Sequence, residues 1–186
     1  YKGFVVHAAP CVTLEEDLKR RDLTVNAIAQ AEDGRLVDPF GGSKDIEQKI
    51  LRHVSDAFEE DPLRVVRLAR FQSRFADFRI DTRTQSMCMR MVKSGELACL
   101  TPERVWQEWA KAATMPRPDL FVQTLVNFDA WQVLFSGFSQ GVRDVQWVSR
   151  AMHKLPPAHL FAVFGQYLSR DAYRAALKKI AMPKGL

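Results

Sequence analysis

The sequence predicts an α+β protein that is mainly α-helical, in which the end of a mixed α/β segment comes first and helices follow. Two observations support this prediction. Asp33-Gly34 separates two short β-rich stretches, and Asp and Gly tolerate the positive φ that a hairpin turn needs. From about residue 53 onward, apolar residues recur at three- and four-residue intervals, which is the period of an amphipathic helix.

The composition is that of a globular protein. The 186 residues are 47% hydrophobic and 26% charged, which is ordinary for a soluble domain. No apolar run approaches the roughly 18 residues of a membrane span, so we expect no membrane contact and a cytoplasmic location. Cys11, Cys88 and Cys99 are odd in number and widely spaced, which argues against a disulfide or a zinc site. The formal net charge of +5 is compatible with a nucleic-acid partner.

Local signals place the first elements. The β-rich stretch YKGFVVHAA opens the chain as a strand. Thr13 followed by Glu16 forms a capping box, which predicts a helix through LEEDLKRRDLTVNAIA. The hairpin at Asp33-Gly34 comes next.

The next two helices have identifiable starts. The pair Gly41-Gly42 ends the second strand of the hairpin, and Ser43 is the expected N-cap of a helix over residues 43–54. Asp61 before Pro62 begins the following helix. An Asp in this place accepts hydrogen bonds from the free amides of the first turn, while proline occupies a position that needs no donor.

The rest of the chain reads as helices. One begins at Asp81 or Thr82 and ends at Gly95, and another spans residues 101–114 with Trp106 and Trp109 in the core. A further helical stretch over residues 120–135 follows a proline-broken link, and Asn127 and Asp129 are candidates to end it before Trp131. The remaining helical stretches are expected over residues 139–155, 156–170 and 171–186.

Asp61 and Arg64 are three residues apart, so on a helix both side chains project over nearly the same face. Cytosine and adenine each offer an amino donor beside a ring-nitrogen acceptor, which matches a carboxylate beside a guanidinium. Uracil and guanine present a carbonyl and a ring N–H in the reversed order, and unpaired polar groups in a dry pocket are penalised heavily. The pair can therefore select C and A. The alternative is that Asp61 is only an N-cap and Arg64 only its salt-bridge partner.

Two further clusters could contact a nucleotide or its phosphates. Arg20-Arg21-Asp22 followed by Asn26 holds more hydrogen-bonding capacity than a solvated face requires. The second cluster stands at three- and four-residue intervals on the helix after Asp61 and comprises Arg64, Arg67, Arg70 and Arg74. This stripe faces phosphates or is a solvated basic face.

Three collinear blocks resemble the bacterial type of the tRNA nucleotidyltransferase family, the template-independent polymerases that build the CCA end of tRNA. The blocks are RRDLTVNA at residues 20–27, VDPFGG at 37–42 and EDPLRVVRLAR at 60–70. The resemblance covers about the first 115 residues. It implies transfer of CMP and AMP from CTP and ATP to the tRNA 3′ end. It also implies the end of a nucleotidyltransferase-type head over 1–52, a helical neck over 53–114 and part of a helical body over 115–186.

The resemblance implies roles for single residues in nucleotide binding. Arg21 and Asp22 match positions near the triphosphate and ribose of the incoming nucleotide, where a carboxylate can accept from the 2′-hydroxyl. Arg67 and Arg70 match positions that meet phosphates or the base. The expected nucleotide-binding residues are therefore Arg21, Asp22, Asn26, Asp61, Arg64, Arg67 and Arg70.

Other matched positions have expected structural roles. Asp38, Gly41 and Gly42 resemble a flexible joint between head and neck, where glycines let the pocket change as the primer end grows; a plain loop explains them equally well. Glu103, Arg104 and Glu108 resemble residues of the helix that stabilises the neck.

Mg²⁺ is the cofactor that the resemblance implies, because phosphoryl transfer needs carboxylates that hold divalent ions about the attacking and leaving oxygens. The family's Gly-Gly…Arg-Asp loop and Asp-x-Asp pair do not occur in this sequence. We therefore expect the chain to be a segment of a longer protein whose N-terminal region supplies the metal ligands. No catalytic residue or metal ligand is assigned within it, and the isolated segment is expected to be inactive.

Two alternatives to CCA addition stay open. A bacterial poly(A) polymerase shares these blocks, although Leu23-Thr24-Val25 and the lead-in TLEEDLK are more similar to the CCA-adding branch. The other alternative is a non-catalytic RNA-binding helical module, in which the basic stripe contacts phosphates and Asp61 only caps its helix.

Overall fold

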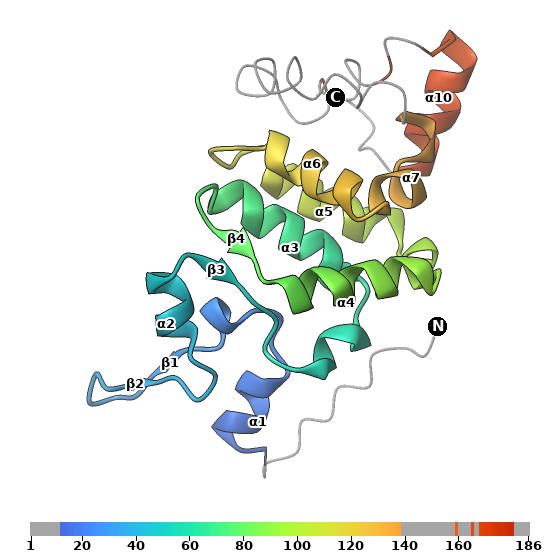
Figure 1. The fold of residues 1–186 in the computed structure, drawn as a ribbon. Helices are drawn as coiled ribbons and strands as arrows, with labels where there is room; N and C mark the ends of the chain where they lie inside the picture. The colour runs from blue at the N-terminus through green and yellow to red at the C-terminus, as the bar shows by residue number, and fades with distance from the viewer. Residues whose placement is uncertain (1–11, 139–158, 160–164, 166–167, 181–186) are drawn as a thin grey trace.

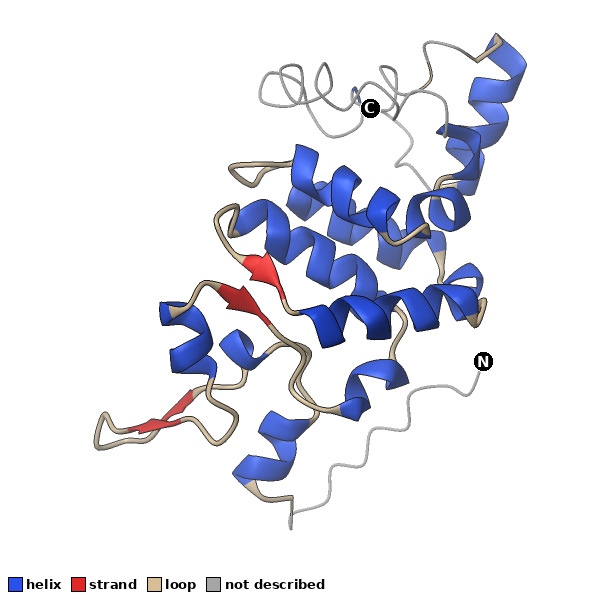
Figure 2. Cartoon of the chain, viewed as in Figure 1, coloured by secondary structure: helices blue, strands red, loops and turns tan. Residues whose placement is uncertain are grey.

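The computed structural model describes residues 12–138, 159, 165 and 168–180 (Figure 1). The strand expected over the first nine residues and the helix expected over residues 139–155 lie outside these described residues, and of the helix expected over residues 156–170 only residues 159, 165 and 168–170 are described. In the described part, a small mixed segment at one end is followed by a stack of helices, as Figure 2 shows. The α+β, mainly α class is confirmed.

The first helix is shorter than predicted. α1 (Leu14–Lys19) has the capping box, because the Thr13 side chain accepts from the Glu16 amide and the Glu16 carboxylate accepts from the Thr13 amide. The expectation that this helix runs on to residue 29 is wrong. Leu23 is extended and forms an antiparallel bridge with His53, and a short 3₁₀ helix, η1 (Thr24–Asn26), follows. Pairing with a distant segment thus overrides local helix propensity.

The hairpin is confirmed. β1 (Ala29–Gln30) pairs antiparallel with β2 (Leu36–Val37), and Gly34 has the positive φ of 83° that the turn needs.

The next helix starts and ends earlier than predicted. α2 (Gly42–Glu47) has Gly41, not Ser43, as its N-cap. The carboxylate of Asp38 supplies the capping bonds, accepting from the Gly42 amide at 2.7 Å and from the Ser43 amide at 2.8 Å. The helix does not reach residue 54, because β3 (Ile50–Leu51) leaves it to pair in parallel with β4 (Arg79–Ile80).

The helical part follows the sequence signals closely. After the 3₁₀ helix η2 (Asp56–Glu60), α3 begins directly after Asp61-Pro62, α4 is N-capped by Asp81, and Gly95 follows its end with a φ of 84°. The bounds are α3 (Leu63–Arg74), α4 (Thr82–Lys93), η3 (Glu96–Cys99), α5 (Pro102–Ala112), α6 (Asp119–Asn127), α7 (Ala130–Leu134), η4 (Ser136–Phe138) and α10 (Arg170–Lys179).

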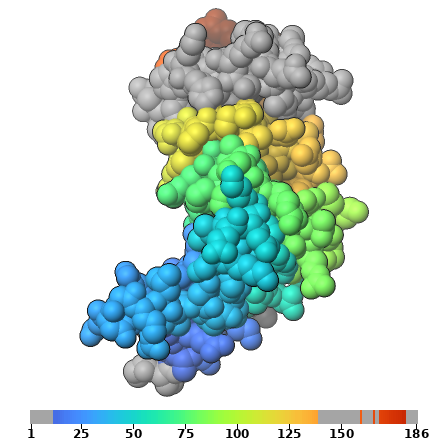
Figure 3. Space-filling view, turned by 60° about the vertical axis from the view of Figure 1, so that its left-hand side comes forward, coloured from blue at the N-terminus to red at the C-terminus, as the bar shows by residue number. Residues whose placement is uncertain are grey.

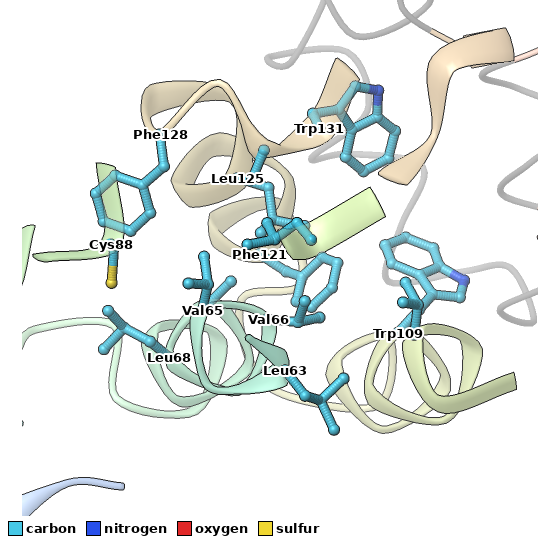
Figure 4. Close-up of a cluster of buried hydrophobic side chains, with 14 of the residues drawn as sticks. Leu63, Val65, Val66, Leu68, Cys88, Trp109, Phe121, Leu125, Phe128 and Trp131 are labelled. Atoms are coloured by element: carbon cyan, nitrogen blue, oxygen red, sulfur yellow. The ribbon is translucent and has the colours of Figure 1, made fainter. Parts of the chain in front are cut away.

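One hydrophobic core joins all three expected segments. Figure 4 shows α3 side chains packed against Trp109 of α5 and Phe121 of α6. Trp109 and Phe121 are fully buried, and Trp106 is 9% exposed, which confirms the predicted core face of α5. The same core includes Leu23 and Leu51, so burial continues from the mixed segment into the helices. None of the described helices is long and apolar enough to cross a membrane.

Ion pairs also tie the mixed segment to the helices. Arg52 donates to Asp45 of α2 at 3.0 Å and to Asp81, the N-cap of α4, at 2.9 Å. Asp45 in turn accepts from the Thr24 hydroxyl at 2.7 Å. In Figure 3 the mixed segment, in blue, lies at one end of the described part, with α3 and α4 in green beyond it.

Candidate functional site

Two blocks that are far apart in the sequence meet at a hollow of about 420 Å³. One group of lining residues lies between Arg20 and Asn26, after α1, and the other lies between Asp61 and Phe71, before and along α3. Six of the predicted nucleotide-binding residues line it, namely Arg21, Asp22, Asn26, Asp61, Arg64 and Arg67. Arg20 and Phe71 complete the lining. The hollow is called the RRD pocket below.

Asp22 is the most heavily bonded group in the RRD pocket. Its Oδ1 accepts from the Leu23 amide at 2.9 Å and from Asn26 Nδ2 at 3.0 Å, while its Oδ2 accepts from Arg67 Nε at 2.7 Å and lies 2.6 Å from Arg67 Nη2. A carboxylate has about four lone-pair positions, and three of them are engaged by these hydrogen bonds. Burial alone would raise the pKa of Asp22, but the charge of Arg67 and these hydrogen bonds outweigh it and lower the pKa.

Arg64 is held by backbone carbonyls. Its two terminal nitrogens donate to the carbonyl oxygens of Ala57 and Arg20. Burial lowers the pKa of this guanidinium, against the opposing effect of the Asp22 and Asp61 carboxylates. Since the usual pKa of arginine is far above neutrality, Arg64 stays charged.

Asp61 has two roles. Its Oδ1 accepts from the Leu63 amide at 3.1 Å, which is the capping bond expected at the start of α3. Its Oδ2 accepts from Arg104 of α5 at 2.8 Å. The ion-pair partner of Asp61 is therefore Arg104 and not Arg64. The alternative that Asp61 caps the helix is supported, but its salt bridge to Arg64 is not formed.

Arg70 does not reach the RRD pocket, contrary to the prediction from the sequence. It is buried, its guanidinium bonds to Glu108 of α5, and it stacks 4.3 Å from the centre of the Phe71 ring. Arg74 lies 5.1 Å from the centre of the Phe75 ring. The four arginines of the predicted α3 stripe thus have different partners, and they do not form one free basic face.

The VDPFGG turn lies inside the mixed segment and outside the RRD pocket. Gly41 has a φ of 72°, which favours glycine. A Cβ on Gly42 would come 2.1 Å from the carbonyl oxygen of Thr24. Close packing therefore explains Gly42, the left-handed backbone conformation explains Gly41, and capping of α2 explains Asp38, without any motion of the turn.

The described residues do not fit a resident metal ion. They contain no group of three His, Cys, Asp or Glu side chains placed to hold one. The two carboxylates that line the RRD pocket are engaged otherwise, because Asp22 pairs with Arg67 and Asp61 pairs with Arg104.

Sequence reasoning missed two residues that matter to the geometry. Phe71 lines the RRD pocket, and its ring centre lies 6.0 Å from the guanidinium carbon of Arg67 and 4.3 Å from that of Arg70, which is outside the pocket. Arg52 links Asp45 to Asp81. The helical spacing of α3 predicts only a place for Phe71 on its apolar face, and no local signal distinguishes Arg52 from a solvated cation, because its partners lie 7 and 29 residues away.

Two family models match the chain. Residues 3–52 match the poly A polymerase head domain, and residues 77–141 match the "Probable RNA and SrmB- binding site of polymerase A". A Multifunctional CCA protein of Methylococcus capsulatus (strain Bath) is 56% identical over 137 residues, which are 73% of this chain and 32% of that protein.

Solved structures show the same arrangement. A CCA-adding enzyme in complex with ATP is 26% identical, with a TM-score of 0.73 over 92% of this chain and 44% of that one. The Thermotoga maritima CCA-adding enzyme complexed with tRNA is 26% identical, with a TM-score of 0.70 over 92% of this chain and 45% of that one. A tRNA-processing enzyme at 24% identity, with a TM-score of 0.78 over 93% of this chain and 54% of that one, supports the fold alone. Together with the collinear blocks that form the RRD pocket, these matches show that the chain belongs to the CCA-adding enzyme family.

Proposed function

We propose that the protein adds CMP and AMP from CTP and ATP to the 3′ end of tRNA, and that the RRD pocket selects the incoming nucleotide. The observation that carries this proposal is that Asp61 and Arg64 line one pocket with Arg21 and Arg67. The chain spans 32% of the length of the curated relative and 44% of a solved CCA-adding enzyme. The activity proposed is that of the whole protein.

Base selection follows from the bonds that Asp61 and Arg64 can exchange. Arg64 now donates to the carbonyls of Ala57 and Arg20, and it would turn one donor to the ring nitrogen of cytosine or adenine. Asp61 keeps its bonds to Leu63 and Arg104 and offers a remaining lone pair to the amino group of the base. Uracil and guanine would leave like groups facing each other, and burial makes that mismatch costly.

The phosphates and the sugar would be met by other residues that line the RRD pocket. Arg21 pairs with Asp17 at 3.0 Å, and both side chains are more than half exposed. A pair of this kind contributes about 0–1 kcal/mol, so Arg21 can exchange Asp17 for a triphosphate at little cost. Arg67 would contact a phosphate with its guanidinium while it stays paired with Asp22. To accept from the ribose 2′-hydroxyl, Asp22 would use the lone-pair position that its hydrogen bonds leave open.

We also propose Mg²⁺ as the cofactor, with its ligands outside the described residues. The proposed partner is tRNA, and the proposed location is the cytoplasm. Bound divalent ions would neutralise charge on the triphosphate during transfer. The residues described here bind and orient the nucleotide.

The test is transfer by the full-length protein to a tRNA that ends before CCA, with each of the four nucleoside triphosphates supplied alone and together. Ordered addition of C, C and A, sequenced from the product, would support CCA addition. Repeated addition of A alone would favour a poly(A) polymerase. Failure to bind CTP or ATP in equilibrium dialysis would favour a non-catalytic RNA-binding module. A chain of residues 1–186 alone should bind nucleotide without transferring it.

A further inference from the structure

The exposed face of α4 carries cations that no carboxylate of that helix balances. Arg83, Ser86, Arg90 and Lys93 are all exposed and follow one another at three- and four-residue intervals, so they form one stripe. Residues 82–93 contain no Asp or Glu. With a rise of about 1.5 Å per residue, the stripe extends about 15 Å from Arg83 to Lys93. These four residues are called the α4 stripe below.

The cations of the α4 stripe are more available than Arg64, Arg67 and Arg70 of α3. Arg64, Arg67 and Arg70 of α3 are held by backbone carbonyls, Asp22 and Glu108. Among the described residues, the side chains of Arg83 and Lys93 form no ion pair. Arg90 pairs with Glu59 at 2.8 Å, but both side chains are largely exposed, at 62% and 44%. A polyanion can therefore engage this face without breaking a buried pair.

A hollow of about 420 Å³ lies at the N-terminal end of the α4 stripe. Arg83, Ser86 and Arg90 line it from α4, and His53 and Asp56 line it from the segment before α3. The Thr84 hydroxyl accepts from the His53 amide at 3.1 Å and contacts His53 Nδ1 at 2.7 Å. When that hydroxyl donates to Nδ1, the ring proton sits on Nε2, and burial favours this neutral form by lowering the pKa of His53. Asp56 is the single carboxylate in the lining.

Shared lining residues relate this hollow to the RRD pocket. A third hollow, of about 570 Å³, shares Asp56 with the hollow beside α4 and shares Arg20 with the RRD pocket. Inside the protein, the antiparallel bridge from Leu23 to His53 places the two sites on neighbouring segments of backbone. A strand whose end lies in the RRD pocket could therefore continue along this edge toward α4.

We propose that the α4 stripe binds the sugar-phosphate backbone of the RNA substrate, upstream of the 3′ end that the RRD pocket extends. Arginine forks and a serine hydroxyl suit phosphate oxygens. His53 is the one ring in the lining of the adjacent hollow, so the site lacks the aromatic platforms on which bases stack. Residues 77–141, which include α4, match the family model described as a probable RNA-binding site. The inference rests on the proposed function for its substrate.

The test is the salt dependence of RNA binding by the full-length protein. A fluorescein-labelled tRNA that ends before CCA is titrated at several salt concentrations, and log K is plotted against log salt. Each lost phosphate contact should reduce the slope by about 0.7–0.9. We expect Arg83→Ala with Lys93→Ala to weaken binding at low salt at least tenfold and to reduce the slope by about 1.5. A wild-type slope in this double variant would overturn the inference.

Two further variants separate phosphate binding from a loss of structure. Arg35→Ala with Lys44→Ala removes the same two charges from the exposed β2 and α2 region, which lies away from α4 in Figures 1 and 3. This control should keep the wild-type slope, and a slope reduced as far as in the α4 variant would overturn a specific site. Glu59→Gln releases Arg90 from its pair and should tighten binding about two- to fivefold. Weaker binding in Glu59→Gln would contradict the proposal.

The outcome for the α4 stripe is distinguishable from that for the proposed function. CTP binding by the Arg83→Ala with Lys93→Ala variant should equal that of the wild type, because neither residue lines the RRD pocket. If the wild type binds RNA through the stripe but transfers no nucleotide, the proposed function fails and the α4 site stands. If transfer proceeds and the variant binds tRNA as the wild type does, the α4 site fails and the proposed function stands.

Discussion

Asp61 and Arg64 line the same pocket, yet each is bonded to a different partner. Arg104 donates to Asp61 at 2.8 Å, while Arg64 donates to the carbonyls of Ala57 and Arg20. The carboxylate and the guanidinium therefore do not neutralise each other by direct contact. The Asp61 carboxylate and the Arg64 guanidinium thus remain available at the start of α3, as an acceptor and a donor for hydrogen bonds to a ligand.

Base choice should depend on both members of this pair. We expect Arg64→Ala in the full-length protein to lower kcat/KM for CTP and ATP by about 30-fold, the equivalent of roughly 2 kcal/mol for one hydrogen bond to a charged group. Asp61→Ala should reduce discrimination against UTP and GTP. The measurement is single-nucleotide incorporation with each triphosphate. Unchanged discrimination in both variants would exclude the pair as the selective edge.

Sugar choice should depend on Asp22. If Asp22 accepts from the 2′-hydroxyl, Asp22→Ala should weaken the preference for CTP over its 2′-deoxy analogue, measured as a ratio of kcat/KM values. Asp22→Asn, which keeps one carbonyl acceptor, is the matched control and should retain part of the preference. If Asp22→Ala discriminates as the wild type does, the function of Asp22 is to orient Arg67 and Asn26, to which it is already bonded.

The two glycines of the VDPFGG turn should respond differently to alanine. Gly42→Ala places a Cβ against the Thr24 carbonyl oxygen and should lower the free energy of unfolding by about 1–3 kcal/mol. Gly41→Ala meets no neighbouring atom within 4 Å but keeps a φ of 72°, and it should cost about 1 kcal/mol. Urea unfolding measures both. If Gly42→Ala is as stable as the wild type while nucleotide addition slows, the flexible-joint interpretation would be preferred to the packing one.

Acid should destabilise the protein partly through Asp22. Its pKa in the folded state lies below the ordinary value of 3.8, so its stabilising contribution is present above about pH 4 and is lost as the pH falls through the folded-state pKa. We expect the free energy of unfolding to fall less steeply between pH 5 and 3 in Asp22→Asn than in the wild type. Equal slopes in urea titrations across this range would show that the Asp22–Arg67 pair does not survive in solution.

Local signals were sufficient for most helix starts. Asp61-Pro62, Asp81 and Thr101-Pro102 carry their capping chemistry within a few residues, and α3, α4 and α5 begin where these signals stand. Local signals failed where a distant partner decides the conformation. The helix expected through LEEDLKRRDLTVNAIA stops because Leu23 and Thr24 bond to His53 and Arg52.

The candidate site shows the same division. The RRD and EDPLR blocks identified six of the residues that line the pocket, because a short motif fixes which chemical groups lie together. Periodicity correctly placed the arginines of α3 on a helix, but it could not show that Glu108 would hold Arg70 or that Asp22 would hold Arg67. The partner of a charge is set by tertiary contacts, which spacing along one helix does not encode.

The pairing of β3 with β4 limits where this protein can be truncated. Residues 50–51 pair with residues 79–80, and Arg52 joins Asp45 to Asp81. A truncation after residue 52 would remove the strand that β3 pairs with, leave Arg52 without Asp81, and expose Leu23 and Leu51 to water. The boundary that the motifs suggest is therefore a poor place to cut. Recombinant pieces meant to isolate nucleotide recognition should extend at least through α6, whose side chains close the shared core.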